Sequence, residues 1–392
     1  MITVKEAQKL INDNIIPLQA LSLPLNQISG CVLAEDLYAE FDIPAFRQSS
    51  MDGYALRFTE NLKELILAGE MAAGANQSFN LEEGETSRIF TGAPLPEGSD
   101  TVVMQEKIEK VGNKILIKDQ QLAKGTNVRE KGSEVKAGAL AITKGTLLGP
   151  AAIGFLAGIG VTQAAVFPTA KVAIILTGNE LQSPGAPLEF GQVYESNSYS
   201  LSAAIKNEGI TEITVFRALD DLQSLTSVLA TAIAGNDVVL LTGGVSVGDY
   251  DFVIEACRNC EVKQVFHKVK QKPGKPLFFG TQGEKIIFGL PGNPSSVLSC
   301  YYNYVLPALK KLSGKSTSVR HLTAELTANY NKPSGLTHFL KGSYHNGKVT
   351  PLHAQESYRM ASFAQSNCLI TLKEDQQIFA AGDTVEILLL PH

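Results

Sequence analysis

The feature that most constrains the fold is a regular alternation of strand-like and helix-like segments between residues 170 and 312. Short apolar runs rich in β-branched residues are typical of strands buried on both faces, and each of the first three runs is followed by a segment with helical spacing. The alternation predicts an open, mostly parallel α/β sheet covered by helices, a fold that binds ligands at the carboxyl ends of its strands. The strand-like runs are KVAIIL (171–176), ITVFRAL (213–219), DVVLL (237–241), VKQVFHKVK (262–270), PLFFG (276–280) and KIIFGL (285–290).

The predicted helices carry recognisable end signals. Ser196 or Asn197 is placed to cap the first helix, and Gly209 is placed to end it. Asn293 stands at the cap position of the last helix, with Pro294 in its first turn. The four helices are expected at 196–209, 221–234, 250–259 and 293–312.

At 392 residues the chain is too long for one compact core. The segments outside residues 170–312 differ from one another in their sequence patterns. Short β-type runs alternate with glycine-rich turns in the first half, apolar helical sequence follows, and short β runs return at the end. We expect an elongated α+β domain (1–45 plus 136–168), an inserted β-rich domain (46–135), the α/β domain (169–314) and a C-terminal β-barrel-like domain (315–392).

Charge, cysteine content and hydropathy exclude several classes of protein. The net charge of −5 leaves no basic surplus for general nucleic-acid binding, and the first residues do not form a signal peptide. The longest apolar run (149–167) is interpreted as a buried helix leading into a strand rather than as a membrane span. The five scattered cysteines favour a reducing cytoplasm, and the C-x-x-C pair Cys257 and Cys260 lacks the second ligand pair that a zinc site needs.

Three polar, glycine-rich loops follow three predicted strands. They are TGNE (177–180), TGGVSVGDYD (242–251) and PGNPSS (291–296). In a parallel sheet these loops share one rim, where backbone amides and helix N-termini favour an anion. None of them is the dinucleotide-binding G-x-G-x-x-G or a Walker A loop, so a standard NAD or P-loop site is not expected.

Lysines crowd into the segment VKQVFHKVKQKPGKP. If HKVKQK is a strand, its period of two places Lys268, Lys270 and Lys272 on one face, where an anion would offset their repulsion. Lys263 and Lys275 flank them. The alternative is an exposed edge strand that lysines protect from aggregation.

Carboxylates also lie just beyond the predicted strand ends. They are Glu180, Asp220, Asp221, Asp249 and Asp251, and carboxylates beside a phosphate site suit Mg²⁺, which takes one or two carboxylates together with waters and phosphate oxygens. Asp221 and Asp249 have the simpler alternative of capping their helices. The pattern favours metal-assisted phosphoryl chemistry, with phosphate binding without reaction as the milder alternative.

Together these segments resemble the molybdopterin molybdenumtransferase family, the MoeA-type enzymes that are related to the C-terminal part of gephyrin. The likeness covers nearly the whole chain, and two motifs in its first third separate this family from the smaller MogA/MoaB-like domains. Those two motifs are SSMDGYAL (49–56) and TGAPLPEGSDTVVMQE (91–106). The others, in the family's order, are TGNEL (177–181), LTGGVSVGDYD (241–251), KPGKPLFFG (272–280) and GLPGNPSS (289–296).

The resemblance implies both an activity and a binding site. Members insert molybdate into the dithiolene of molybdopterin, taking adenylylated molybdopterin as substrate and releasing AMP in a Mg²⁺-dependent step. The fold implied is an α/β multidomain protein with a MogA/MoaB-like central sheet. The binding residues implied are Thr177, Gly178, Thr242, Gly243, Gly244, Ser246, Gly248, Lys275, Pro291, Gly292, Asn293, Pro294, Ser295 and, in the C-terminal domain, Ser362.

The same match assigns the reacting centre. Glu180, Asp220 and Asp251 would surround the metal and molybdate, while Lys268 and Lys272 meet anionic groups. The resemblance further implies a homodimer with a shared active site, to which Asp52 and Thr91 of the β-rich domain reach from the partner subunit. The implied ligand is a pterin nucleotide, and the implied partner is the adenylyltransferase that supplies it, in the cytoplasm and without nucleic acid or membrane.

The chain departs from the family pattern at four positions. Glu134 and Glu195 stand where aspartate is frequent, and His338 and Lys341 stand where many members have arginine. Two other functions remain open. A molybdopterin adenylyltransferase shares the α/β loops but normally lacks the inserted β domain, and a scaffold of the gephyrin type would not need catalysis.

Overall fold

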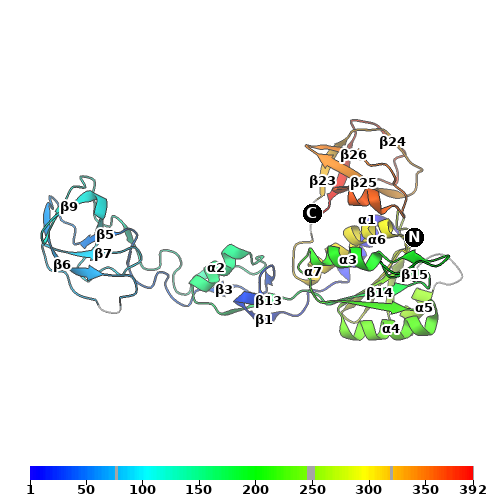
Figure 1. The fold of residues 1–392 in the computed structure, drawn as a ribbon, viewed down its shortest axis with the longest axis horizontal. Coiled ribbons are helices and arrows are strands. Elements are labelled where there is room, and N and C mark those ends of the chain that lie inside the picture. Colours follow the sequence, from blue (N-terminus) through cyan, green and yellow to red (C-terminus); the bar gives the residue numbers. More distant parts are fainter. Residues whose placement is uncertain (76–77, 245–251, 318–320, 392) are drawn as a thin grey trace. The chain divides into compact units, whose positions relative to one another are not determined.

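A computed structural model describes residues 1–75, 78–244, 252–317 and 321–391 (Figure 1). The chain divides into two compact units. One consists of Met1–Leu23, Gly30–Ala34 and Ala165–His392, and the other of Pro24–Ser29 and Glu35–Ala164. The predicted domain boundaries remain predictions.

The centre of the first unit is a six-stranded α/β sheet. Four strands are parallel, which confirms the expected mostly parallel sheet. The last two strands run antiparallel to their neighbours in the sheet. A tight turn at Gly283 joins the strand at 278–282 directly to the strand at 285–290 and leaves no room for a crossover helix between them. The order is β17 (Ile213–Ala218), β14 (Val172–Thr177), β18 (Val238–Thr242), β22 (Lys285–Leu290), β21 (Phe278–Gln282) and β19 (Lys263–His267).

Helices cover both faces of this sheet (Figure 1). Alternate strand residues point to opposite faces, so Ile174 packs in one core and Ile175 in the other. The first face carries α1 (Val4–Asp13), α3 (Asn197–Lys206), α6 (Pro294–Cys300), the π-helical η3 (Tyr301–Val305) and α7 (Leu306–Leu312). The second face carries α4 (Leu222–Gly235) and α5 (Phe252–Asn259).

The C-terminal part of the first unit is a closed five-stranded barrel, which confirms the predicted β-barrel-like domain. A sixth strand, β20 (Gln271–Lys272), joins it from the lysine-rich segment of the α/β region and pairs in parallel with β25. The barrel strands are β25 (Thr337–His345), β26 (Lys348–Pro351), β23 (His321–Leu326), β29 (Thr384–Leu389) and β27 (Cys368–Leu372). The remaining elements are β24 (Tyr330–Asn331), β28 (Ile378–Phe379) and α8 (Met360–Ala364).

The second unit contains the expected β-rich module. Its main sheet has the order β8 (Thr101–Met104), β5 (Gly53–Leu56), β7 (Glu85–Ile89), β6 (Glu64–Met71), β10 (Lys114–Ile117) and β9 (Ile108–Val111). Smaller pairings join β4 (Gln48–Ser49) to β11 (Val128–Arg129) and β3 (Leu37–Tyr38) to β12 (Leu140–Ile142).

The apolar run at 149–167 forms α2 (Pro150–Gly158) followed by β13 (Gln163–Phe167), which confirms a helix leading into a strand. Only Leu156 of α2 is buried, so the expected burial of this helix is not found within one chain. Across the described ranges, no helix is long and apolar enough to cross a membrane. All five cysteines are buried.

Candidate functional site

A pocket of about 960 Å³ lies at the carboxyl ends of β14, β18 and β22. The described parts of the three glycine-rich loops meet there as the sequence predicted, and residues 193–197, the segment 271–276 and the C-terminal loop 355–358 also line the pocket. The sequence-predicted residues in its wall are Thr177, Gly178, Glu180, Asp220, Thr242, Gly243, Gly244, Lys272, Lys275, Pro291, Gly292, Asn293 and Pro294.

The loop after β14 brings Glu180 into the pocket. Gly178 has φ +136°, and a Cβ there would lie 2.7 Å from Oε2 of Glu180, so the carboxylate folds back over a glycine backbone. Asn179 Oδ1 accepts from the backbone N–H of Asp220 at 3.3 Å, which joins this loop to the one after β17. Asp221 caps α4 by accepting from Ser224 N at 2.8 Å, so the simpler role proposed for it is confirmed.

The loop after β18 packs tightly against the first loop. Thr177 Oγ1 donates to the carbonyl of Thr242 at 3.2 Å. Gly243 has φ +87°, and a Cβ there would lie 2.7 Å from the carbonyl oxygen of Thr177. The two loops can therefore approach this closely only because Gly243 has no side chain. Ser246, Gly248, Asp249 and Asp251 lie outside the described residues.

Alanine at Gly243 is expected to lower the urea-unfolding midpoint far more than alanine at Gly209. Both glycines have positive φ, but the space around the Gly209 Cβ position is open. Positive φ alone costs about 1 kcal/mol, whereas the backbone clash at Gly243 should raise the cost to roughly 2–4 kcal/mol. Equal shifts for the two variants, followed by circular dichroism, would contradict a close approach of the two loops.

The third loop is held by side chains from neighbouring elements. Asn197 Nδ2 donates to the carbonyl of Gly292 at 2.9 Å, and Asn293 Nδ2 donates to Ser357 Oγ at 2.8 Å. Ser295 is buried beside the pocket rather than in its lining, and its N–H donates to the carbonyl of Ser357 at 3.0 Å. Asn293 caps α6 by position and Pro294 begins it, as predicted.

Buried polar atoms around the pocket lack partners within the described part of the chain. They are Thr242 Oγ1, Asn197 Oδ1 and Ser295 Oγ. Buried polar atoms in folded proteins are nearly always hydrogen-bonded. Thr242 and Asn197 belong to the pocket lining.

The predicted face of three lysines does not form. β19 ends at His267, Lys268 adopts φ +76°, and only Gln271 and Lys272 resume a strand. A strand cannot continue through such a φ, so the period-two expectation fails at Lys268. Lys272 and Lys275 line the pocket, while Lys268 is not among the residues around it.

Two of the four residues that depart from the family pattern, Glu195 and Glu134, differ in burial. The carboxylate of Glu195 is buried and accepts from Ser198 N at 2.7 Å and from Ser198 Oγ at 2.6 Å. Ser196 occupies the N-cap position of α3, as expected for one of the two candidates, but its side chain makes no capping hydrogen bond, and Glu195 supplies it instead; the helix ends at Lys206, before Gly209. Glu134 is exposed.

Asp52 and Thr91 form a pair within the second unit. The N–H and the hydroxyl of Thr91 both donate to Asp52 Oδ1 at 2.8 Å. The backbone N–H and then the hydroxyl of Thr91 hold the pKa of Asp52 below its usual value. Asp52 is therefore an anionic side chain at neutral pH.

In the barrel, Ser362 is buried, and its hydroxyl donates to the carbonyls of Ala354 and Arg359 rather than facing the pocket. Burial, followed by the positive charges of Lys332 and Lys272, lowers the pKa of His338 to about 4. His338 is therefore neutral near pH 7. Sequence reasoning missed the wall residues 355–358; the only signal was a run of polar residues between two β segments.

A mostly parallel sheet with a pocket at its strand ends, walled on one side by residues of a β-barrel domain, defines a multidomain α/β ligand-binding protein. Residues 2–160 match the MoeA N-terminal region (domain I and II), residues 173–311 match a probable molybdopterin binding domain, and residues 323–390 match the MoeA C-terminal region (domain IV). The chain belongs to the molybdopterin molybdenumtransferase (MoeA) family.

The relatives agree over the full length of the chain. The molybdopterin molybdenumtransferase 2 of Mycobacterium tuberculosis is 32% identical, with 99% of each chain covered. The molybdopterin molybdenumtransferase of Haemophilus influenzae is 31% identical, covering 100% of this chain and 99% of the relative. A crystal structure of the MoeA protein from Pyrococcus horikoshii is 30% identical and superposes with a TM-score of 0.85, with 99% of each chain covered.

Proposed function

We propose that this protein inserts molybdenum into adenylylated molybdopterin and releases AMP, forming the molybdenum cofactor. The observation that carries the proposal is the pocket, in which the described parts of three glycine-rich loops meet within residues that match a probable molybdopterin binding domain. The curated relatives are named molybdopterin molybdenumtransferases.

The pocket residues have complementary roles in this reaction. The backbone at Gly243, Gly244 and Gly292 binds phosphate oxygens. Lys272 and Lys275 offset the charge of molybdate and of the phosphoanhydride, two anions that repel each other in water. No nucleophilic side chain is required. We also assign Ser246, Gly248 and Asp251, which follow Gly244 in the same loop, to this binding site on the basis of the resemblance alone.

The proposal also assigns a magnesium ion to this pocket. No cluster of three or more His, Cys, Asp or Glu side chains stands ready for a metal in the described ranges. Glu180 and Asp220 nevertheless both line the pocket, and Mg²⁺ is commonly held by two carboxylates with waters and phosphate oxygens. When bound there, the cation would polarise the phosphoanhydride and help AMP to leave.

The active unit in this proposal is a homodimer with a shared site, located in the cytoplasm. Asp52 and Thr91 would complete the pocket of the partner subunit, since both lie in the unit that does not contain the pocket loops. Helix α2 supports an interface, because its sequence PAAIGFLAG has no polar side chain and only Leu156 is buried within one chain. The adenylyltransferase that makes the substrate is the proposed supplier.

Incubation of the purified protein with adenylylated molybdopterin, molybdate and Mg²⁺ is expected to release one AMP for each cofactor loaded with molybdenum. AMP is followed by chromatography and the metal by mass spectrometry. Omission of molybdate should stop cofactor formation. Synthesis of adenylylated molybdopterin from ATP would identify an adenylyltransferase instead, and no reaction with either substrate would favour a scaffold.

A further inference from the structure

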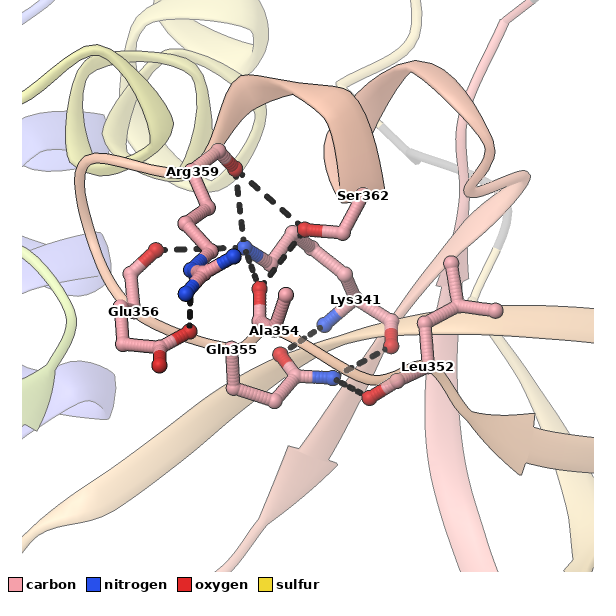
Figure 2. A network of polar contacts seen from close by, with 7 residues as sticks. All are labelled: Lys341, Leu352, Ala354, Gln355, Glu356, Arg359 and Ser362. Carbon is pink, nitrogen blue, oxygen red and sulfur yellow. Dashed lines mark hydrogen bonds and ion pairs between the residues drawn. The ribbon is translucent and has the colours of Figure 1, made fainter.

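A buried lysine of the C-terminal barrel is enclosed by a single loop. Lys341 lies on β25 with only 2% of its surface exposed. Its Nζ donates to the backbone carbonyls of Ala354 at 2.8 Å, Arg359 at 3.1 Å and Glu356 at 3.3 Å (Figure 2). An ammonium group has three hydrogens, and all three acceptors belong to residues 354–359, the 354–359 loop.

Further hydrogen bonds hold the start of this loop on β25. Gln355 Oε1 accepts from the backbone N–H of Lys341, and Gln355 Nε2 donates to the carbonyl of Lys341, both at 2.9 Å (Figure 2). Gln355 Nε2 also donates to the carbonyl of Leu352 at 2.8 Å. Ser362 Oγ donates to the carbonyl of Ala354 at 2.7 Å, so this carbonyl receives two donors.

The outer side of the same loop forms one wall of the pocket. Ser357 accepts from Asn293 Nδ2 through its hydroxyl at 2.8 Å, and its carbonyl accepts from Ser295 N at 3.0 Å. These contacts join the loop to the phosphate-binding turn at the start of α6. The wall residues contributed by the loop are Gln355, Glu356, Ser357 and Tyr358.

We propose that Lys341 is a positioning residue for substrate binding: its ammonium fixes the 354–359 loop, and the loop in turn fixes Ser357, Asn293 and the pocket wall. The inference deepens the proposed function and rests on it for the identity of the ligand. Sequence alone marked Lys341 only as a departure from arginine.

The chemistry of the side chain supports this role. Three carbonyls that converge on one nitrogen match a compact ammonium, whereas a planar guanidinium distributes its donors over a fork. A buried ammonium is costly unless it is fully hydrogen-bonded, and burial lowers the pKa of Lys341. Without the ammonium, each of the three carbonyls would lose one donor. The Ser362 hydroxyl would still donate to Ala354 and Arg359, and the N–H of Arg359 to Glu356, so the loop would be held by fewer hydrogen bonds.

The test is Lys341→Met in the full-length protein, with Lys348→Met as the matched control. Lys348 is an exposed lysine on the adjacent strand β26, paired with the exposed Glu325. We expect Lys341→Met to raise KM for adenylylated molybdopterin about tenfold, to change kcat less than about twofold, and to speed hydrogen exchange in the peptide 353–359. Lys348→Met should leave all three values unchanged.

Hydrogen exchange needs no ligand, so it tests the loop even if the proposed function fails. Unaltered exchange in 353–359, or a fall in kcat with KM unchanged, would overturn the positioning role. If Lys341→Met does not fold, Ser362→Ala replaces it, because it removes the hydroxyl that donates to the carbonyls of Ala354 and Arg359 and leaves the lysine in place. The same increase in exchange, smaller in size, is expected there, and its absence would count against the proposal.

Discussion

Glu180→Gln is expected to reduce the rate of AMP release by about 100-fold or more, because a carboxylate that holds a divalent cation contributes several kcal/mol of charge stabilisation in the transition state. Glutamine has nearly the same shape as glutamate, so it can occupy the space above Gly178. The link between Asn179 and Asp220 uses a side-chain amide and a backbone N–H, neither of which is altered. The substitution therefore removes charge and leaves the loop in place.

The matched control is Glu189→Gln, which removes one carboxylate from an exposed residue outside the pocket lining. Turnover is measured as a function of Mg²⁺ concentration, and AMP affinity is measured by calorimetry without Mg²⁺. Glu180→Gln should raise the Mg²⁺ concentration needed for half-maximal rate and leave metal-free AMP affinity within about twofold. Wild-type turnover in this variant would remove Glu180 from the reacting centre.

Local patterns were sufficient to predict the rim of the site. Buried strands appear as β-branched runs, and the residues that follow such strands in a parallel sheet must lie at the same edge. The sequence therefore predicts that TGNE, TGG and PGNPSS lie together, as they do in the pocket. Gly243 also follows this logic, since a loop that meets another backbone needs a residue without a side chain.

Long-range pairing could not be read in the same way. β20 contains only Gln271 and Lys272, so it is too short to show a periodic pattern, and its partner Thr337 lies far along the chain. This pairing therefore could not be predicted from the sequence. The positive φ of Lys268 could not be predicted from the sequence either, because lysine has no preference for that conformation. Both features decide which lysines reach the pocket.

Hydrogen bonds made by individual side chains account for other differences between expectation and structure. Glu195 accepts from Ser198 and so caps α3, although it precedes the N-cap position, where a capping side chain is expected. Ser362 matches a family serine, yet its hydroxyl is used by two carbonyls of the 354–359 loop. A motif identifies a residue, but the atoms that its side chain contacts depend on segments elsewhere in the chain.

Asp52→Ala is expected to abolish AMP release while the protein stays folded and dimeric. Asp52 holds Thr91 through two hydrogen bonds, and the low pKa of Asp52 keeps it charged, so alanine removes both a charge and the anchor of the TGAP turn. Asp42→Ala is the control, because Asp42 likewise accepts a backbone N–H, from Ala137, in the same unit. Turnover is measured beside sedimentation, and an active Asp52→Ala protein would contradict the proposed role.

Mixing the two inactive variants tests whether the site is shared between subunits. In a heterodimer of Asp52→Ala and Glu180→Gln chains, a shared site collects both substitutions at one pocket and leaves the other pocket intact. Random subunit exchange makes half of the dimers heterodimers, so activity should return to about a quarter of the wild-type value. If Asp52 instead served the pocket of its own chain, every pocket in the mixture would carry one substitution, and no activity would return. Recovery therefore requires that Asp52 of one chain act together with Glu180 of the other.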